Sequence, residues 1–369
     1  MGNTTAGGAK SRSSFARPRV CRLSRCLPRA ATSLRGISGA GHSFFAVFLL
    51  AALFAAPSLY AQNPIPPITT PALPPPPGQN LEGHRLKTDV DLVVLHVTVT
   101  DSKGAFVPDL GQNEFRVLED KIEQKISLFS RDDVPVTMGL VIDNSGSMRE
   151  KRAQVNAAAM TFVKTSNPQD EAFVVNFNDE YYLDTEGDFT SDQRNLNDAL
   201  ARIDTRGSTA LYDAVIGSLA HLKKGHKDKR VLLVVTDGDD DASRKTFEDA
   251  IKAAEESNAT IYTIGVFSED DLKNDKKMVR HSKKVLTELA EATGGLAYFP
   301  ANLDEVTPVC EEVAKEIRNQ YTLGYYPTNG SRDGSFRAVQ VQVLPPGGRG
   351  KLLVRTRTGY YAAKPSAAD

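Results

Sequence analysis

Three oxygen-bearing side chains at alternate positions, Asp143, Ser145 and Ser147, are the residues of this chain best suited to chemistry. They follow a mainly apolar run at 136–142, which is typical of a strand buried on both faces. One carboxylate and two hydroxyls on a short loop are hard oxygen ligands, the kind that a small divalent cation such as Mg²⁺ prefers. The pattern therefore predicts a metal site on the loop that leaves this strand.

Serine and glycine are common in ordinary loops, so this pattern alone leaves open a loop without any ligand. Two further segments favour the metal site. Thr209 lies at the start of a predicted helix at 209–223, and Asp237 follows a second apolar run at 230–236. Because the carboxyl ends of parallel strands meet at one edge of an α/β sheet, we expect the three loops to converge.

The three segments, in this order, resemble the metal-ion-dependent adhesion site (MIDAS) of the von Willebrand factor type A (VWA) family. The resemblance implies that Ser145 and Ser147 bind the metal directly. Asp143, Thr209 and Asp237 would complete the shell, directly or through water. The ion is expected to be Mg²⁺ or Mn²⁺, with one position left for water or for an Asp or Glu carboxylate of a protein partner. Binding of this kind needs no catalytic base.

The segment around these loops alternates between strand and helix patterns, which predicts an α/β fold with a doubly wound, mostly parallel, Rossmann-like sheet. The expected strands are 136–142, 172–177, 230–236, 261–266 and 295–299. One helix is expected to start near Arg149. Further helices are expected at 191–203, 209–223, 244–257, 281–293 and 303–318. The resemblance implies that the VWA domain spans 134–320.

Both flanks of this domain carry strand patterns, as in the alternation of apolar and polar residues over 93–100. Neither flank is long enough to bury a two-sided core alone. We therefore expect 85–133 and 321–363 to join in one smaller β-sandwich-like module, with 134–320 inserted between them and a tail at 364–369. The flanks look like those of exported VWA-related proteins of acidobacteria, which implies an architecture more than an activity.

The first 61 residues predict export. A stretch with eight Lys or Arg and no Asp or Glu is followed by an apolar run of about 13 residues and by small residues that end at Ala61. The run is shorter than the roughly 20 residues of a membrane-spanning helix. Cleavage after Ala61 would place the protein in the periplasm, on the cell surface or outside the cell. An uncleaved segment 1–61 would be a membrane anchor. A Pro-rich linker follows at 62–84.

Removal of residues 1–61 would change the charge of the chain. The 369 residues include 45 basic and 46 acidic ones, and without the eight basic residues of this segment the formal charge falls from −1 to −9. Such an acidic protein is poorly suited to bind nucleic acid. Cys21 and Cys26 would leave with the segment, so Cys310 could form no intrachain disulfide. Its place on an apolar helical stripe predicts a buried structural thiol.

Other kinds of site fit less well. Asp237, Asp239 and Asp241 imitate the start of a calcium loop, but Ala242 stands where an EF-hand needs glycine. No serine-hydrolase motif or zinc spacing is visible, so a hydrolase is the least favoured class. The sequence favours an exported, metal-dependent, non-enzymatic module for protein binding or adhesion. The alternative is an accessory subunit that regulates an ATPase or chelatase complex.

Overall fold

The computed structural model describes residues 91–165, 167–202, 204–344 and 350–364. The predicted signal segment 1–61, the linker 62–84 and nearly all of the tail 364–369 lie outside these residues. The described residues belong to one compact unit, Gly83–Asp369. None of their helices is both long and apolar enough to cross a membrane.

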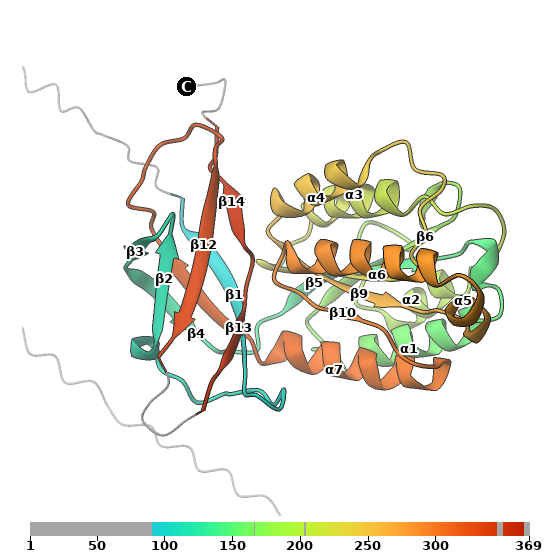
Figure 1. Ribbon diagram of the computed structural model, residues 1–369, viewed down its shortest axis with the longest axis horizontal. Coiled ribbons are helices and arrows are strands. Elements are labelled where there is room, and N and C mark those ends of the chain that lie inside the picture. The colour runs from blue at the N-terminus through green and yellow to red at the C-terminus, as the bar shows by residue number, and fades with distance from the viewer. Residues whose placement is uncertain (1–90, 166, 203, 345–349, 365–369) are drawn as a thin grey trace, which may run out of the picture. The chain divides into compact units, whose positions relative to one another are not determined.

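A six-stranded sheet forms the centre of the α/β domain (Figure 1). Its order is β10-β9-β8-β5-β6-β7, and only the edge strand β7 is antiparallel to its neighbour. The strands are β5 (Val136–Asp143), β6 (Glu171–Phe177), β7 (Tyr181–Leu183), β8 (Lys229–Thr236), β9 (Ala259–Gly265) and β10 (Ala297–Tyr298). Every residue of β5 is buried, as its apolar sequence predicted. The predicted α/β fold is confirmed.

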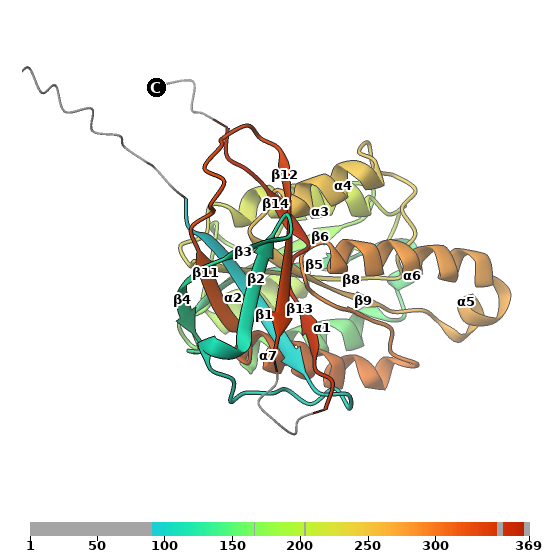
Figure 2. The same cartoon turned by 60° about the vertical axis from the view of Figure 1, so that its left-hand side comes forward.

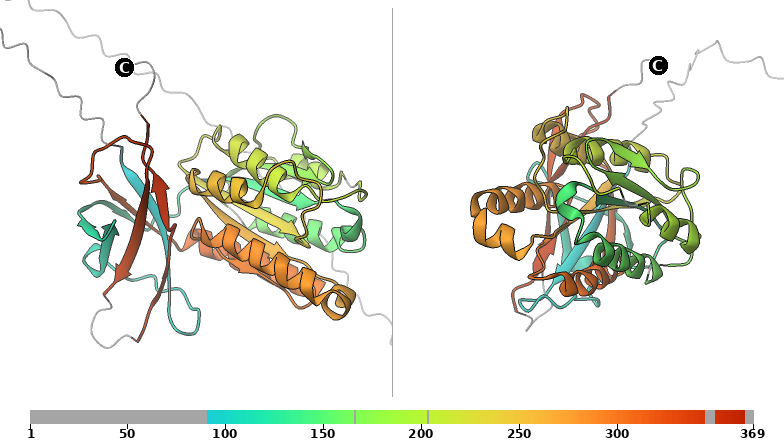
Figure 3. Two further views of the ribbon diagram at one scale, coloured as in Figure 1. Left: turned by 45° about the horizontal axis from the view of Figure 1, so that its top comes forward. Right: turned by 90° about the vertical axis from the view of Figure 1, so that its right-hand side faces the viewer.

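Helices cover both faces of this sheet (Figures 1 and 3). They are α1 (Arg152–Lys164), α2 (Gln193–Leu200), α3 (Leu211–Leu222), α4 (Phe247–Glu255), α5 (Glu269–Asn274), α6 (Lys276–Glu291) and α7 (Val306–Arg318). Short 3₁₀ turns precede α1 at Gly146–Met148 and α7 at Leu303–Glu305. Apolar residues of α1, α2 and α7 pack in one core, and those of α3, α4 and α6 pack in a second core on the other face.

Two elements of the α/β domain were not predicted, and one of its helices starts earlier than expected. The edge strand β7 and the helix α5 are too short to show a period in the sequence. Helix α6 begins before residue 281 because the Asp275 carboxylate accepts a hydrogen bond from the backbone N–H of Met278 and so caps the helix.

The flanking strands form two antiparallel four-stranded sheets, ordered β13-β1-β11-β4 and β14-β12-β2-β3 (Figure 2). The strands are β1 (Val93–Thr100), β2 (Phe115–Glu119), β3 (Ile122–Gln124), β4 (Ile126–Ser130), β11 (Tyr321–Tyr325), β12 (Phe336–Val343), β13 (Leu353–Arg355) and β14 (Gly359–Tyr361). A 3₁₀ turn at Gln112–Glu114 precedes β2. Each sheet contains strands from both flanks, and Leu95, Val117 and Leu323 share their core. Neither flank could therefore form this β module alone.

The buried carboxylate of Glu316, near the end of α7, joins the α/β domain to the β module. Its Oε1 accepts hydrogen bonds from the hydroxyls of Thr98 (3.0 Å) and Tyr262 (3.1 Å). Its Oε2 accepts one from Arg355 Nη2 at 2.7 Å. A buried charge is costly unless it is paired and hydrogen-bonded, and here the partners come from β1, β9 and β13. These contacts fix the two parts of the unit against each other.

Candidate metal site

The loop after β5 carries the first three predicted ligands. Asp143 is fully buried, and its carboxylate accepts hydrogen bonds from the backbone N–H of Ser145 (2.8 Å) and from the hydroxyl of Thr236 (2.6 Å). Ser145 is buried and Ser147 is exposed, with their hydroxyl oxygens 3.1 Å apart. The two serines therefore present adjacent oxygens at the surface end of a buried strand.

A second loop carries the buried Thr209 to the start of α3. The backbone N–H of Gly146 donates to the carbonyl of Gly207 (3.2 Å), and this bond joins the second loop to the serine loop. Gly207 has a φ of +75°, and a Cβ at this position would lie 2.1 Å from a carboxylate oxygen of Asp179. Only glycine fits this turn, which sets the direction from which Thr209 enters the site.

The third loop follows β8 and carries Asp237. Thr209 donates its backbone N–H to Asp241 Oδ1 (2.7 Å), which joins the second loop to the third. The bond from Thr236 to Asp143 joins the third loop to the first. The structure thus links the three loops pairwise, and all five residues predicted as ligands lie on them.

Asp143 and Asp237 place two negative charges close together in a buried position. Burial, and then the charge of Asp237, raise the pKa of Asp143 to about 6, although hydrogen bonds from Ser145 and Thr236 lower it. The folded chain therefore disfavours the ionised carboxylate in the absence of a positive charge. A divalent cation would supply that charge, and the hydroxyl and carboxylate oxygens suit Mg²⁺ or Mn²⁺. The donor set therefore fits a metal ion.

Lys151 was not predicted to belong to this site. Its Nζ donates to Asp237 Oδ2 (3.2 Å) and to Asp271 Oδ2 (3.4 Å), and its side chain is only 7% exposed. Lys151 is the N-cap residue of α1, where the helix dipole disfavours positive charge. A lysine at a predicted helix start, directly after the serine loop, is the signal by which sequence reasoning could have found it.

Asp240, on the same loop as Asp237, has hydrogen-bond partners within the fold. Asp240 Oδ1 accepts hydrogen bonds from the backbone N–H of Tyr212 (3.2 Å) and the hydroxyl of Ser243 (2.6 Å), so it supports the start of α3.

The thiol of Cys310 is buried as predicted, and burial raises its pKa to about 12. In the described part of the chain, no group of three or more His, Cys, Asp and Glu side chains is suited to a metal. The candidate site is of another kind, because it combines two carboxylates with three hydroxyls.

The segment that carries these loops matches a known domain family. Residues 138–239 match the model of the von Willebrand factor type A domain. The match begins within β5 and ends two residues after Asp237, so it contains all five residues predicted as ligands. No curated protein matches the chain.

Several solved structures are similar to parts of this chain. A von Willebrand factor type A protein from Catenulispora acidiphila is 14% identical, with a TM-score of 0.43 over 76% of this chain and 75% of that one. The vWF domain of a type V pilus tip protein from Porphyromonas gingivalis is 13% identical, with a TM-score of 0.41 over 50% of this chain and 95% of that domain. Proximal thread matrix protein 1 of the mussel byssus, with zinc in its MIDAS motif, is 16% identical, with a TM-score of 0.43 over 54% of this chain and 49% of its own.

Proposed function

Because the chain contains a VWA domain, we propose that it is an exported, non-enzymatic module that binds a protein partner through a divalent cation, Mg²⁺ or Mn²⁺. The ligands would be the side chains of Asp143, Ser145, Ser147, Thr209 and Asp237. The observation that carries this proposal is the convergence of three hydrogen-bonded loops around a buried pair of carboxylates. Of these two carboxylates, Lys151 pairs with Asp237 only, so a cation bound beside Asp143 would offset the remaining buried charge.

The residues of the chain have separate tasks in this proposal. Ser145 and Ser147 would bind the ion directly, and Thr209 with the two carboxylates would complete its shell. The bound ion would supply Lewis acidity towards an Asp or Glu of the partner. The hydroxyl of Thr236 donates a hydrogen bond to the Asp143 carboxylate, and this contact would orient the proposed ligand before an ion arrives.

The surface beside the serine loop supports a protein as the partner. Three consecutive side chains of the edge strand β7, Tyr181, Tyr182 and Leu183, are 46%, 48% and 41% exposed. Tyr182 and Asn144 line the same surface hollow of about 500 Å³. Exposed aromatic side chains are frequent anchors of protein interfaces. A partner could therefore contact the metal and this aromatic edge together.

Capture from the cell envelope tests the proposed binding. The purified protein serves as bait for cross-linking in an envelope fraction of the source organism, once with Mg²⁺ and once with EDTA. We expect one partner to be captured by the wild-type chain in Mg²⁺ and lost in EDTA. The matched bait Asp143→Asn should fail to capture it in either buffer. A partner captured equally under all of these conditions would contradict the proposal.

Export is proposed from the order of basic, apolar and small residues in 1–61, which lie outside the described residues. The native protein is expected to begin near Gln62 and to be found in the envelope or outside the cell. N-terminal sequencing after cell fractionation measures both. An intact N-terminus in the cytosol would contradict export, whereas an intact N-terminus in the membrane fraction would identify an uncleaved anchor.

A further inference from the structure

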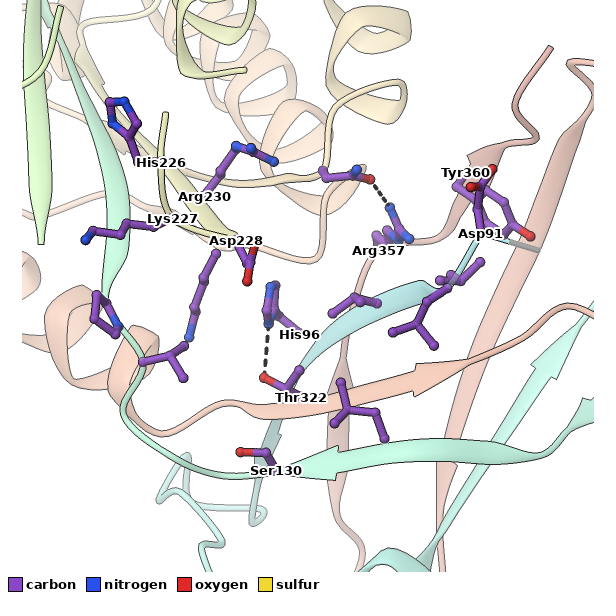
Figure 4. A pocket seen from close by; sticks show the side chains of 18 of the residues that line it. Asp91, His96, Ser130, His226, Lys227, Asp228, Arg230, Thr322, Arg357 and Tyr360 are labelled. Carbon is purple, nitrogen blue, oxygen red and sulfur yellow. Dashed lines mark hydrogen bonds between the residues drawn. The ribbon is translucent and has the colours of Figure 1, made fainter. Parts of the chain in front are cut away.

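A cavity of about 960 Å³ lies between the β module and the amino ends of the central strands (Figure 4). It is lined by residues of β1, β4, β11 and β14 and by the segment that leads into β8. Strand β8 begins at this cavity with Lys229 and ends beside the metal loops with Thr236. The two sites are therefore one strand length apart, roughly 23 Å at 3.3 Å per residue. No residue of the cavity belongs to the proposed metal site.

Basic side chains outnumber acidic ones in the lining of this cavity. Asp91 pairs with Arg332 at 3.0 Å, which reduces its effect on the cavity. Lys229 Nζ donates to the carbonyl of Ile317 at the end of α7. Among the described lining residues, the lysines and arginines are Lys227, Lys229, Arg230 and Arg357, and the carboxylates are Asp91 and Asp228.

Burial disfavours the charged forms of three residues that line the cavity. Burial, then Lys229 and Arg357, lower the pKa of His96 to about 3. Burial, then Arg318, lower the pKa of Lys229 to about 7, and burial lowers the pKa of Arg357. In each case burial is the largest cause, because it disfavours the charged form. A bound anion would remove this penalty.

Two guanidinium groups line the cavity, and each has an unpaired Nε–H group. The Nε atoms of Arg230 and Arg357 are buried and have no hydrogen-bond partner in the described part of the chain. Arg357 Nη1 donates to Asn258 (2.9 Å), and the guanidinium lies 5.4 Å from the ring centre of Tyr360 (Figure 4). These contacts fix its orientation. A guanidinium fixed in this way suits the oxygens of a carboxylate or phosphate that enters the cavity.

The remainder of the wall is largely apolar, with Leu92, Leu128 and Val134 among the lining residues. Small-molecule sites typically combine apolar walls with a few polar groups that fix orientation. We propose that this cavity binds an organic anion, with a carboxylate or phosphate head held by Arg230 and Arg357 and an apolar body against the three aliphatic side chains.

Titrations followed by NMR test this site directly. Purified ¹⁵N-labelled protein is titrated with phenyl phosphate, with benzoate and with neutral benzyl alcohol, in EDTA. We expect saturable shifts of the Arg230 and Arg357 Nε–H signals with at least one anion, and at least tenfold weaker binding of benzyl alcohol. The stronger of the two anions identifies the head group. The double variant Arg230→Gln/Arg357→Gln is expected to bind this anion at least tenfold more weakly.

The control variant is Arg194→Gln, because Arg194 is 94% exposed on α2 and lines no part of this cavity. It should bind the anion as the wild type does. Failure of both anions to give saturable shifts, or equal binding by the double variant, would overturn the proposal. If the double variant does not fold, the NMR shifts of the wild-type protein decide the question. Shifts confined to residues outside the cavity would also overturn the proposal. EDTA makes the result independent of the proposed metal site.

Discussion

Replacement of Asp143 by asparagine is expected to abolish stabilisation by Mg²⁺ while making the metal-free protein more stable. Asparagine keeps the shape of the side chain, and the Thr236 hydroxyl can accept a hydrogen bond as well as donate one. The substitution removes a buried charge whose pKa is raised from 3.8 to about 6, a difference on the order of 3 kcal/mol. Thermal denaturation with and without Mg²⁺ measures both effects. A variant that Mg²⁺ still stabilises would contradict the assignment of Asp143.

The pH dependence of stability gives an independent control on the same carboxylate. Because the folded-state pKa of Asp143 lies above its unfolded value, the folded chain binds more protons between about pH 4 and 6. The contribution of Asp143 should therefore stabilise the metal-free protein as the pH falls from 6 towards 4. With saturating Mg²⁺ the sign reverses, because protonation competes with the metal. Both contributions should be missing from Asp143→Asn.

Replacement of Lys151 by methionine is expected to tighten Mg²⁺ binding by at least tenfold, about 1.4 kcal/mol. The ammonium group occupies Asp237 Oδ2 and adds a positive charge beside the place where the metal would lie. Methionine has a similar length and fills the same buried space without the charge. The metal-free variant should in turn be less stable than the wild type, because Asp237 loses its buried partner. Calorimetric titration and thermal denaturation measure the two effects.

The matched control for this prediction is Lys151→Arg, which keeps the positive charge and should not tighten Mg²⁺ binding. Weaker binding by Lys151→Met than by the wild type would show that Lys151 assists the metal rather than competing with it. In that case the role assigned to the ammonium group would be wrong.

The strands and loops that position the site could be predicted from the sequence. The apolar runs of β5 and β8 are long enough to predict buried parallel strands, and the position of Asp143 and Asp237 at their ends follows from the strand ends alone. The general rule that ligands bind at the carboxyl ends of such strands then predicts that the loops converge. For this reason the α/β fold and the grouping of the loops needed no knowledge of side-chain packing.

Contacts between residues distant in the chain could not be predicted in this way. The direction of Lys151 towards Asp237 and Asp271 depends on side-chain packing between residues up to 120 positions apart. The three-residue strand β7 exists because it pairs with β6, and its own sequence shows no clear alternation. The cavity beside Lys229 requires the β module to pack against the α/β domain, and no local pattern encodes that packing.

Calorimetric titration of Mg²⁺ into the purified wild-type protein and the double variant Ser145→Ala/Ser147→Ala tests the central claim most directly. The two substitutions remove the proposed direct ligands and leave both carboxylates in place. One binding site in the wild type, and at least hundredfold weaker binding in the variant, about 2.7 kcal/mol, is the expected result. Absence of binding by the wild type, or equal affinity of the two proteins, would contradict the metal site.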